Sequence, residues 1–567
     1  MPAPPTQVTI YESDHTEEAF FPQQSVYDYL LPQAEGISPR PTYDDALPAF
    51  IDGPSGTVLT RGGLADAALR IASGLTQLGM KPGDVVSIWG RNCLEWVQAM
   101  YGCMAAGLVI TPANVAYAPF ELAHQMNNSG AQMMLVDPLL LPLFEATRPL
   151  FTASLFPASR VILLCDTADK PEDSPYKSLG EILGDRHATP VKLDGADAHT
   201  TAFLCYSSGT TGLPKGVMTS HFNLTSQLQA ANISFPQIEW DKDVILGVLP
   251  FSHVYGLAVV LMHPVTRGVP VVILPKFDEI SMLTAIQSYK ITYGLIVPPI
   301  VIVLLHSKNL PHYDCSSLHT LVCAAAPLAR SLQAAFNARL PHIVLMQGYG
   351  MTECSPATHS MRREESVGRA GTVGRLLPGY QARLVDAKGH DVKPHHAGEL
   401  WLRGPCVMKG YHNNAEATAS TIGPGGWLRT GDILVRSQDG FWRVIDRVKE
   451  LIKYKGFQVA PAELEGVLME HPMVADAGVV GVYDASQATE LPRAYIVPKE
   501  EYADYVLLPQ EVQDFVAATV AGYKKLRGGV QTIDVVPKSP SGKILRKLLR
   551  ERAQREYDAI NPNKAKL

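Results

Sequence analysis

The sequence predicts an α/β protein, in which a large N-terminal domain of stacked sheets and helices is followed by a small α+β domain. Three observations lead to this fold class. The chain has 567 residues, which is more than one compact hydrophobic core can organise. Over most of its length, segments with the 3.6-residue period of a helix alternate with short β-branched runs. From residue 447 onward, the few predicted helices and strands indicate a compact small α+β domain.

The first elements establish the alternation. Apolar residues between 64 and 78 recur at steps of three and four, which predicts a helix that Gly79 ends. The β-branched run 85–89 predicts a strand. A further helix is predicted at 94–106, and buried strands at 133–136 and 161–164. Helix and strand in alternation indicate parallel sheets covered by helices on both faces.

The small domain has a different element order. A helix is predicted to begin at Pro461 and another to end near Val520, because each has apolar residues on one face. Strands are predicted at 477–482, 494–497 and 533–536. We place the domains at 1–446 and 447–567, with the boundary in a charged segment, and expect 560–567 to form a loose polar tail.

Composition and charge exclude several functions. Hydrophobic residues make up 46% of the chain, and the formal charge of −6 gives no electrostatic reason to expect nucleic-acid binding. The 8 cysteines are scattered without metal-ligand spacing, so we expect buried thiols and no structural metal. Neither a leader peptide nor a membrane span of roughly 20 uninterrupted apolar residues is expected.

The strongest functional signal is the segment 206–216, directly after a predicted strand at 202–205. Its glycines let the backbone turn tightly, so that successive N–H groups can converge on phosphate oxygens. A Walker P-loop is excluded, because Pro214 precedes the lysine and no Gly-Lys-Ser/Thr opens a helix. The expected triphosphate-binding residues are Ser207, Ser208, Gly209, Thr210, Thr211 and Lys215.

Four further motifs follow this segment. They lie at 347–353, 427–432, 446–461 and 540–544. In this order the five motifs resemble those of the adenylate-forming superfamily, which contains acyl-CoA synthetases, luciferases and peptide-synthetase adenylation domains. By that resemblance the four are, in turn, the adenine-pocket and magnesium segment, the ribose segment, the hinge with the coenzyme A loop, and the terminal lysine loop.

The resemblance implies an enzyme that uses ATP and Mg²⁺ to convert a carboxylic acid into an acyl-adenylate, releases pyrophosphate, and transfers the acyl group to coenzyme A. Because two anions must meet, cations and aligned N–H donors are required. Lys543 is expected to bridge the carboxylate and the α-phosphate, Asp432 to accept the ribose hydroxyls, and Arg447 to hold ribose or phosphate. Glu353, helped by Thr211 or Thr352, is expected to bind Mg²⁺. Further nucleotide contacts are expected from Ala325, Gln347, Gly348, Tyr349 and Thr352.

The same resemblance assigns the transfer step to other residues. His253 is expected to gate the carboxylate and then clear a path for the thiol, and Lys276 to contact the coenzyme A phosphates. The small domain is expected to be mobile and to rotate about Lys449, which removes the Lys543 loop from the cleft. The residues expected to replace it are Lys453 and Gln458 at the adenylate, and Lys455 and Gly456 along the coenzyme A channel.

The branch of the superfamily is indicated by 453–465 and 537–543, which are most similar to 4-coumarate:CoA ligases and luciferases. Two segments depart from the plant ligases: Trp401 stands where they have a cysteine, and 323–327 reads Cys-Ala-Ala-Ala-Pro, where Gly-Ala-Ala-Pro is usual. The expected acyl pocket is lined by Tyr255, Ala325 and Gly348. Small residues there leave aryl, hydroxycinnamate-like and medium-chain acids open as substrates.

Three alternatives stand beside coenzyme A ligation: transfer to a carrier protein, luciferase-like oxidation, and a non-catalytic nucleotide-binding regulator. Amino-acid activation is disfavoured, because Ser252 occupies the position where such relatives place an aspartate for the ammonium group. The regulator is disfavoured because Lys543, Asp432 and Glu353 are all present.

The last three residues, Ala565-Lys566-Leu567, are a variant of the Ser-Lys-Leu peroxisomal address. The expected partners are therefore a small carboxylic acid, ATP, coenzyme A and a peroxisomal import receptor. If the address is not used, we expect a cytoplasmic protein.

Overall fold

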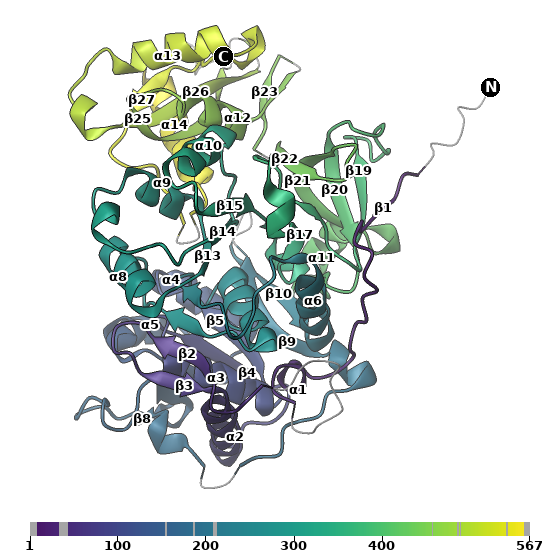
Figure 1. Cartoon of the computed structure of the whole chain (residues 1–567), viewed down its shortest axis with the longest axis vertical. Helices are drawn as coiled ribbons and strands as arrows, with labels where there is room; N and C mark the ends of the chain where they lie inside the picture. Colours follow the sequence, from purple (N-terminus) through teal and green to yellow (C-terminus); the bar gives the residue numbers. More distant parts are fainter. Residues whose placement is uncertain are drawn as a thin grey trace.

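The computed structural model describes residues 8–32, 43–152, 156–184, 187–207, 213–448, 450–455, 457–484, 487, 489–539 and 542–560. Two large sheets with helices on their faces form the lower and middle parts of the molecule in Figure 1, and a third sheet packs beside them. The small C-terminal unit lies above (Figure 1). The expected α/β fold class is confirmed.

The first sheet has seven strands in the order β10-β9-β5-β4-β6-β7-β8. Their bounds are β4 Val85–Trp89, β5 Val109–Ala113, β6 Met133–Val136, β7 Val161–Leu163, β8 Lys177–Ser178, β9 Thr201–Ser207 and β10 Lys215–Ser220. Neighbours are parallel except β9 and β10, which form an antiparallel pair around the predicted phosphate segment.

The second sheet also has seven strands, in the order β15-β14-β13-β11-β12-β2-β3. Their bounds are β2 Pro48–Asp52, β3 Val58–Thr60, β11 Ile245–Gly247, β12 Val271–Ile273, β13 Tyr293–Ile296, β14 Thr320–Cys323 and β15 Val344–Gln347. All neighbours from β15 to β2 are parallel. Strands β11 to β14 are buried throughout, as expected for a parallel sheet with both faces covered.

Eleven helices of the described residues accompany these sheets. They are α1 Val26–Leu30, α2 Arg61–Gln77, α3 Leu94–Ala105, α4 Pro119–Ser129, α5 Leu141–Thr147, α6 His221–Ser234, α7 His263–Arg267, α8 Glu279–Tyr289, α9 Pro298–His306, α10 Arg330–Arg339 and α11 Ala415–Thr421. Helix α2 begins where the Thr60 side chain accepts a hydrogen bond from the Gly63 N–H. It packs closely on α3 at Gly102, where a Cβ would lie 2.4 Å from Ile71.

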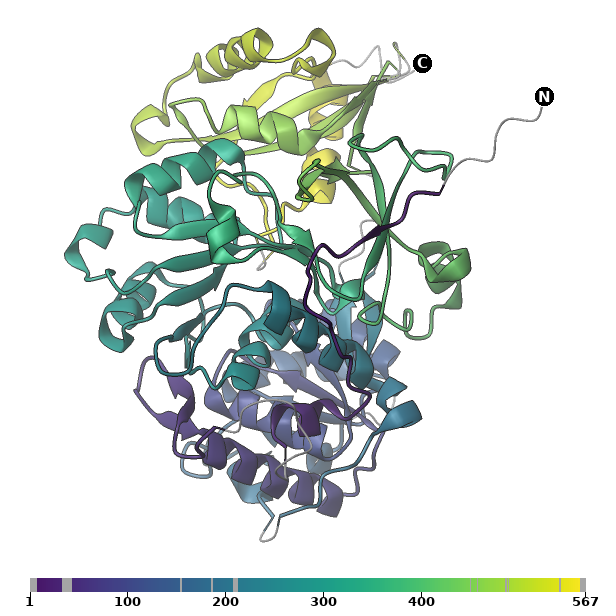
Figure 2. The same cartoon turned by 45° about the vertical axis from the view of Figure 1, so that its right-hand side comes forward.

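The third sheet is antiparallel and includes the start of the described chain. Its strands are β1 Tyr11–Glu12, β19 Gln381–Val385, β20 Gly398–Arg403, β21 Leu428–Arg436 and β22 Trp442–Arg447. A short sheet of β16 Tyr349–Gly350, β17 Ala357–Ser360 and β18 Arg375–Leu376 leads into it. Figure 2 shows the N-terminal segment crossing the front of the molecule to reach this sheet.

The small unit has a hydrophobic core of its own, built from residues between Ile452 and Tyr557. Its elements are β23 Ile452–Tyr454, β24 Phe457–Val459, α12 Pro461–Leu468, β25 Val474–Asp484, β26 Thr489–Pro498, α13 Leu508–Thr519, β27 Val530–Thr532 and α14 Arg546–Ile560. The loop before α14 reaches down toward the large unit in both views (Figures 1 and 2). The boundary at 446/447 stays a prediction.

Most predicted elements are present, with two corrections. The predicted strand at 533–536 is wrong. The paired residues of β27 and β26 end at Thr532, and the Ile533 N–H donates the last hydrogen bond to β26, to the Ile496 carbonyl. The tail was predicted from residue 560, but Ile560 belongs to α14; residues 561–567 lie outside the described residues. Within the described part of the chain, no helix is both long and apolar enough to cross a bilayer.

Candidate active site

Several of the predicted residues lie where parallel strands of the second sheet end. His253 follows β11, Lys276 follows β12, Ala325 follows β14, and Gly348 follows β15. In open α/β sheets, ligands bind outside the carboxyl ends of the strands. The topology therefore collects residues from four distant segments at one edge of the sheet.

Glu353 lies on the phosphate side of this edge. Its carboxylate is 8% exposed and accepts hydrogen bonds from Ser207 Oγ (3.1 Å) and from the Tyr411 hydroxyl (2.8 Å). Both bonds go to Oε1, and among the described residues none goes to Oε2. Glu353 thus offers one hard oxygen next to the end of β9, which fits a divalent cation held jointly with a phosphate.

Tyr411 was not predicted from the sequence. It comes 58 residues after Glu353, and the ring lies 4.9 Å from the Nζ of Lys215. It therefore connects the predicted metal ligand with the predicted phosphate lysine. No local pattern around Tyr411 indicates this, because the contact depends on how β10 and the segment before α11 pack.

The predicted ribose residues form one connected network around the buried Asp432. Asp432 on β21 is 3% exposed, and its Oδ1 is 2.9 Å from the Nε of Arg447 on the neighbouring strand β22. The Tyr349 hydroxyl donates to the other oxygen, Oδ2, at 2.6 Å. Burial and the Asp432 charge raise the pKa of Tyr349 well above its usual value, so the hydroxyl remains a donor.

An aromatic row supports Tyr349 from behind. The ring of His359 lies 5.6 Å from that of Tyr349 and 5.0 Å from that of Trp442, and Trp442 contacts Tyr11 edge-on at 5.6 Å. Burial lowers the pKa of His359 to about 3, so its ring is neutral at physiological pH. The N-terminal segment is thus linked by packing to the predicted nucleotide site.

Gln347 is held within the protein. Its Nε2 donates to Gln333 Oε1 at 3.1 Å, and its Oε1 accepts from the Leu328 N–H at 3.3 Å. It ends β15 and is buried. In this structure Gln347 therefore fixes the loop after β14, which contains Ala325, relative to the strand before Gly348.

Lys543 reaches this site from the small unit. It lies in a tight hairpin, in which the Ser539 N–H donates to the Lys543 carbonyl at 2.8 Å and Lys538 pairs with Ile544. Gly542 has a φ of +78°, and a Cβ there would lie 2.8 Å from Cδ of Pro299 at the start of α9. The hairpin is therefore docked against the end of β13.

The electrostatics show which groups surround Lys543. Burial and the neighbouring Arg447 lower the pKa of Lys543 to about 8, while Glu450, Asp432 and Glu353 act in the opposite direction. Lys543 in turn acts on His253, whose pKa burial and this charge lower to about 4. One half-buried lysine thus lies within electrostatic reach of the predicted ribose, metal and gating residues.

The predicted acyl side is more apolar. The Tyr255 hydroxyl donates to the Val322 carbonyl at 3.1 Å, and the ring is buried. His253 Nδ1 accepts from the Tyr255 N–H at 3.2 Å. Ala325 has a φ of +70° and is exposed, and Gly348 is half-buried. These residues surround the strand ends without any charged side chain among them.

Lys276, which follows β12 at the same edge, is exposed. Other predicted residues are not brought to this place. Lys453 and Lys455 are exposed on the β23–β24 hairpin at the upper edge of the small unit (Figure 1), where Lys453 pairs with Gln458. Thr352 begins a short turn before Glu353. Ser208, Gly209, Thr210, Thr211, Lys449, Gly456, the Gln458 side chain and Ala565–Leu567 lie outside the described residues.

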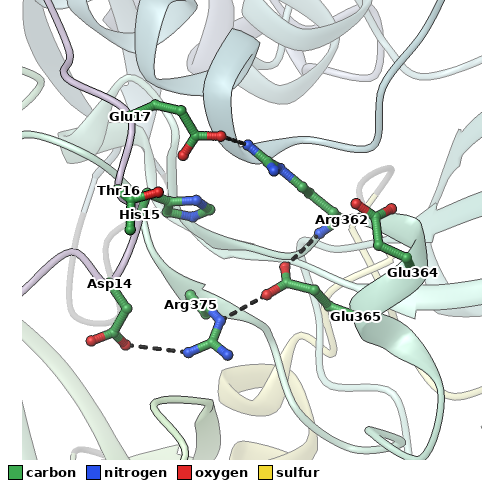
Figure 3. A pocket seen from close by; sticks show the side chains of 8 residues that line it. All are labelled: Asp14, His15, Thr16, Glu17, Arg362, Glu364, Glu365 and Arg375. Carbon is green, nitrogen blue, oxygen red and sulfur yellow. Dashed lines mark hydrogen bonds and ion pairs between the residues drawn. The ribbon is translucent and has the colours of Figure 1, made fainter.

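A separate polar cavity of about 310 Å³ lies behind the site, at the N-terminal segment (Figure 3). Glu17 pairs with Arg362, and Glu365 pairs with Arg375 at 2.8 Å. Asp14 is bound by Arg375 at 3.4 Å and by Arg436 at 2.8 Å. These ion pairs attach the N-terminal segment to the large unit, which makes the cavity part of a structural contact.

Comparisons with known proteins agree with this arrangement. A family model described as AMP-binding enzyme matches residues 42–412, and one described as AMP-binding enzyme C-terminal domain matches 463–543. A 4-coumarate–CoA ligase of Pinus taeda is 38% identical over 89% of this chain and 92% of its own. A peroxisomal OPC-8:0-CoA ligase of Arabidopsis thaliana is 37% identical over 88% of this chain and 89% of its own.

Solved structures show the same architecture. An anthranilate CoA ligase in complex with anthranoyl-AMP superimposes with a TM-score of 0.81 at 25% identity, over 94% of this chain and 98% of its own. The o-succinylbenzoate coenzyme A synthetase of Bacillus subtilis, in complex with ATP and magnesium, superimposes with a TM-score of 0.75 at 26% identity, over 93% and 99%. The chain belongs to the AMP-binding enzyme family and is an AMP-forming acid–CoA ligase.

Proposed function

We propose that this ligase activates an aryl, hydroxycinnamate-like or medium-chain acid, with the residues gathered at the strand ends in the roles given below. The observation that supports this most is the position of Lys543, within electrostatic reach of Asp432, Arg447 and Glu353. A lysine that enters from the small unit at this point can neutralise charge between a carboxylate and a phosphate.

In the first step, a carboxylate oxygen of the acid bonds to the α-phosphorus of ATP, and the bond to pyrophosphate breaks. Lys543 lies between the two anions, and its ammonium group stabilises the charge that they bring together. Asp432 accepts the ribose hydroxyls and is itself oriented by Arg447 and Tyr349. Glu353 and Ser207 lie together at the phosphates. A bound Mg²⁺ supplies charge neutralisation at the phosphate oxygens.

In the second step, the coenzyme A sulfur bonds to the acyl carbon and AMP leaves. Burial and the charge of Lys543 lower the pKa of His253 to about 4, so the ring is neutral at physiological pH and adds no positive charge beside the acyl-adenylate. Lys453, Gln458, Lys455 and Gly456 are proposed to reach the cleft when the small unit rotates about Lys449. Lys276 is proposed to contact the coenzyme A phosphates.

The substrate class is proposed from the acyl side of the site. Ala325 and Gly348 add little volume, and a Cβ at Gly348 would meet only ordinary contacts at 3.5 Å. The buried Tyr255 closes one end through its bond to Val322. Relatives named for 4-coumarate and for OPC-8:0 support an organic carboxylic acid as the substrate, and both the aryl and the medium-chain classes are therefore included in the test.

The test is formation of coenzyme A esters with magnesium-ATP across benzoic, cinnamic, medium-chain and long-chain acids. We expect a thioester with one of the first three classes. Release of pyrophosphate without a thioester would instead favour a carrier protein or oxygen as the acceptor. If the protein binds ATP but releases no pyrophosphate with any acid, the non-catalytic regulator becomes the better interpretation.

A further inference from the structure

A buried arginine lies three residues after Lys543. Arg546 is the first residue of α14 and is 8% exposed. Its Nη1 is 2.6 Å from Glu450 Oε2, and its Nη2 is 2.6 Å from Glu465 Oε2. The side chains of Glu450 and Glu465 are 9% and 14% exposed, so the two ion pairs are largely shielded from water.

The two carboxylates belong to elements that border the candidate site. Glu450 lies in the turn after β22, where its N–H donates to the Arg447 carbonyl at 3.0 Å. Glu465 lies on α12, and its other oxygen accepts from the Val479 N–H of β25 at 2.9 Å. Arg546 therefore ties the start of α14 to the turn beside Arg447 and to the centre of the small unit.

The catalytic hairpin is fixed at two points with Lys543 between them. On one side, Gly542 packs against Pro299 of the large unit. On the other, Leu545 donates from its N–H to the Pro537 carbonyl at 2.8 Å, and Arg546 follows at once. Movement at Arg546 would shift the hairpin relative to Asp432 and Arg447.

Stability alone does not explain this arrangement. Removing two carboxylates and a guanidinium from water has a large desolvation cost, and apolar side chains of similar volume often replace a buried ion pair without loss. A guanidinium that binds two carboxylates through separate nitrogens does constrain direction, because its five N–H donors form a rigid planar fork. The two ion pairs therefore fix the orientation of Arg546 relative to Glu450 and Glu465.

We propose that Arg546 is a positioning residue for adenylate formation: its ion pairs with Glu450 and Glu465 hold the Lys543 hairpin at the angle that places the ammonium group beside Asp432 and Arg447. This inference rests on the proposed role of Lys543. A displacement of about 1 Å at a reacting group can cost on the order of 100-fold in rate. Loss of this anchor therefore affects the chemical step more than nucleotide binding, to which Arg546 does not contribute.

The test compares Arg546→Gln with Arg493→Gln. Arg493 is a matched control, because it is 3% exposed and anchors the other end of the same helix through Glu556 at 2.7 Å. Each variant is assayed for acid-dependent exchange of pyrophosphate into ATP, for thioester formation from supplied acyl-adenylate, and for thermal unfolding. Lys543→Ala serves as the reference for loss of adenylation.

We expect Arg546→Gln to lower kcat of adenylate formation by roughly 10- to 100-fold with little change in the KM for ATP. Thioester formation from supplied adenylate should remain within a few-fold of the unchanged enzyme. Arg493→Gln should unfold at a lower temperature but retain both half-reactions. Equal losses in the two arginine variants, or equal losses in the two half-reactions of Arg546→Gln, would overturn the proposal.

A second variant keeps the proposal testable if Arg546→Gln does not fold. Glu450→Gln keeps the volume and one acceptor oxygen while it removes one ion pair, and we expect a smaller loss confined to adenylation; unchanged adenylation would overturn the proposal. The Lys543→Ala reference distinguishes a failure of the proposed Lys543 role from a failure of the proposed Arg546 role. If that variant keeps adenylation, the proposed role of Lys543 fails; if it loses adenylation while Arg546→Gln and Glu450→Gln keep it, only the positioning role fails.

Discussion

At the scale of single residues, the site places two cations among three carboxylates. Lys543 and Arg447 are surrounded by Asp432, Glu353 and Glu450. Burial disfavours the ammonium form of Lys543, and Arg447 adds to this effect, so the lysine holds its proton less firmly than a solvated one. Its charge is therefore available at neutral pH but sensitive to alkaline conditions.

Adenylate formation should decline as the pH rises above about 8. The pKa of Lys543 is lowered from 10.5 to about 8, so the ammonium form is present below this value and is lost as the pH rises through it. We expect kcat/KM for pyrophosphate exchange, which reports the free enzyme, to show a basic limb near pH 8. Thioester formation from supplied adenylate is the control and should lack that limb. A limb near pH 10 instead would show that Lys543 titrates as a solvated lysine.

Asp432→Asn should raise the KM for ATP by roughly 10- to 100-fold, because it weakens a charge-assisted acceptor and leaves the half-buried Arg447 without its ion pair. The matched control is Asp391→Asn in the same sheet, where a buried aspartate pairs with Arg383 at 2.8 Å away from the candidate site. Steady-state kinetics with varied ATP measure both. A similar rise in the control would attribute the effect to the sheet and not to ribose binding.

At the scale of elements, the hairpin before α14 is one part of the small unit that reaches the large one. Its approach requires Gly542, where positive φ and the contact with Pro299 both leave no place for a side chain. Local sequence predicts a turn at this position, since Pro, Ser and Gly are turn residues. It does not reveal that the turn docks on α9, because that contact joins residues far apart in the chain.

Gly542→Ala should lower adenylation at least 10-fold while the protein remains folded, because a Cβ 2.8 Å from Cδ of Pro299 pushes the hairpin outward. Gly529→Ala is the control: it has a similar φ of +87° but only one contact, at 3.9 Å, so it carries the same backbone strain without the clash. Pyrophosphate exchange and thermal unfolding are measured for both. If the two variants lose adenylation equally, backbone strain and not docking is the cause.

Sequence periodicity was most informative for elements whose own apolar spacing determines whether they form a helix or a strand. The strand Val85–Trp89 and the helix that begins at Pro461 appear as predicted, since their apolar spacing alone specifies them. The predicted strand at 533–536 failed because Ile533 and Val536 are buried in the core of the small unit, although pairing with β26 ends with the Ile533 N–H. Likewise Tyr411, His359 and Arg546 carry no local signal. Each acts through a partner that only the tertiary fold brings near.

At the scale of the whole molecule, the last residues carry a separate prediction. A reporter fused to the N-terminus of the protein should collect in peroxisomes when the chain ends in Ala565-Lys566-Leu567, because the import receptor reads a free C-terminal tripeptide. The same fusion without Leu567 should stay diffuse. Fluorescence microscopy against a peroxisomal marker measures this, and a diffuse signal from both fusions would remove the prediction.

The attachment of the N-terminal segment also bears on how the chain folds during synthesis. Tyr11 contacts β19 and β22, Asp14 pairs with Arg436 on β21, and Glu17 pairs with Arg362. These partners leave the ribosome only after most of the large unit has been made. Translation adds about 5–20 residues per second, so the first residues wait tens of seconds before their docking site exists. Until then Trp442, which packs on His359 behind Tyr349, lacks its contact with Tyr11, so this support of the predicted nucleotide site forms only after the large unit has been synthesised.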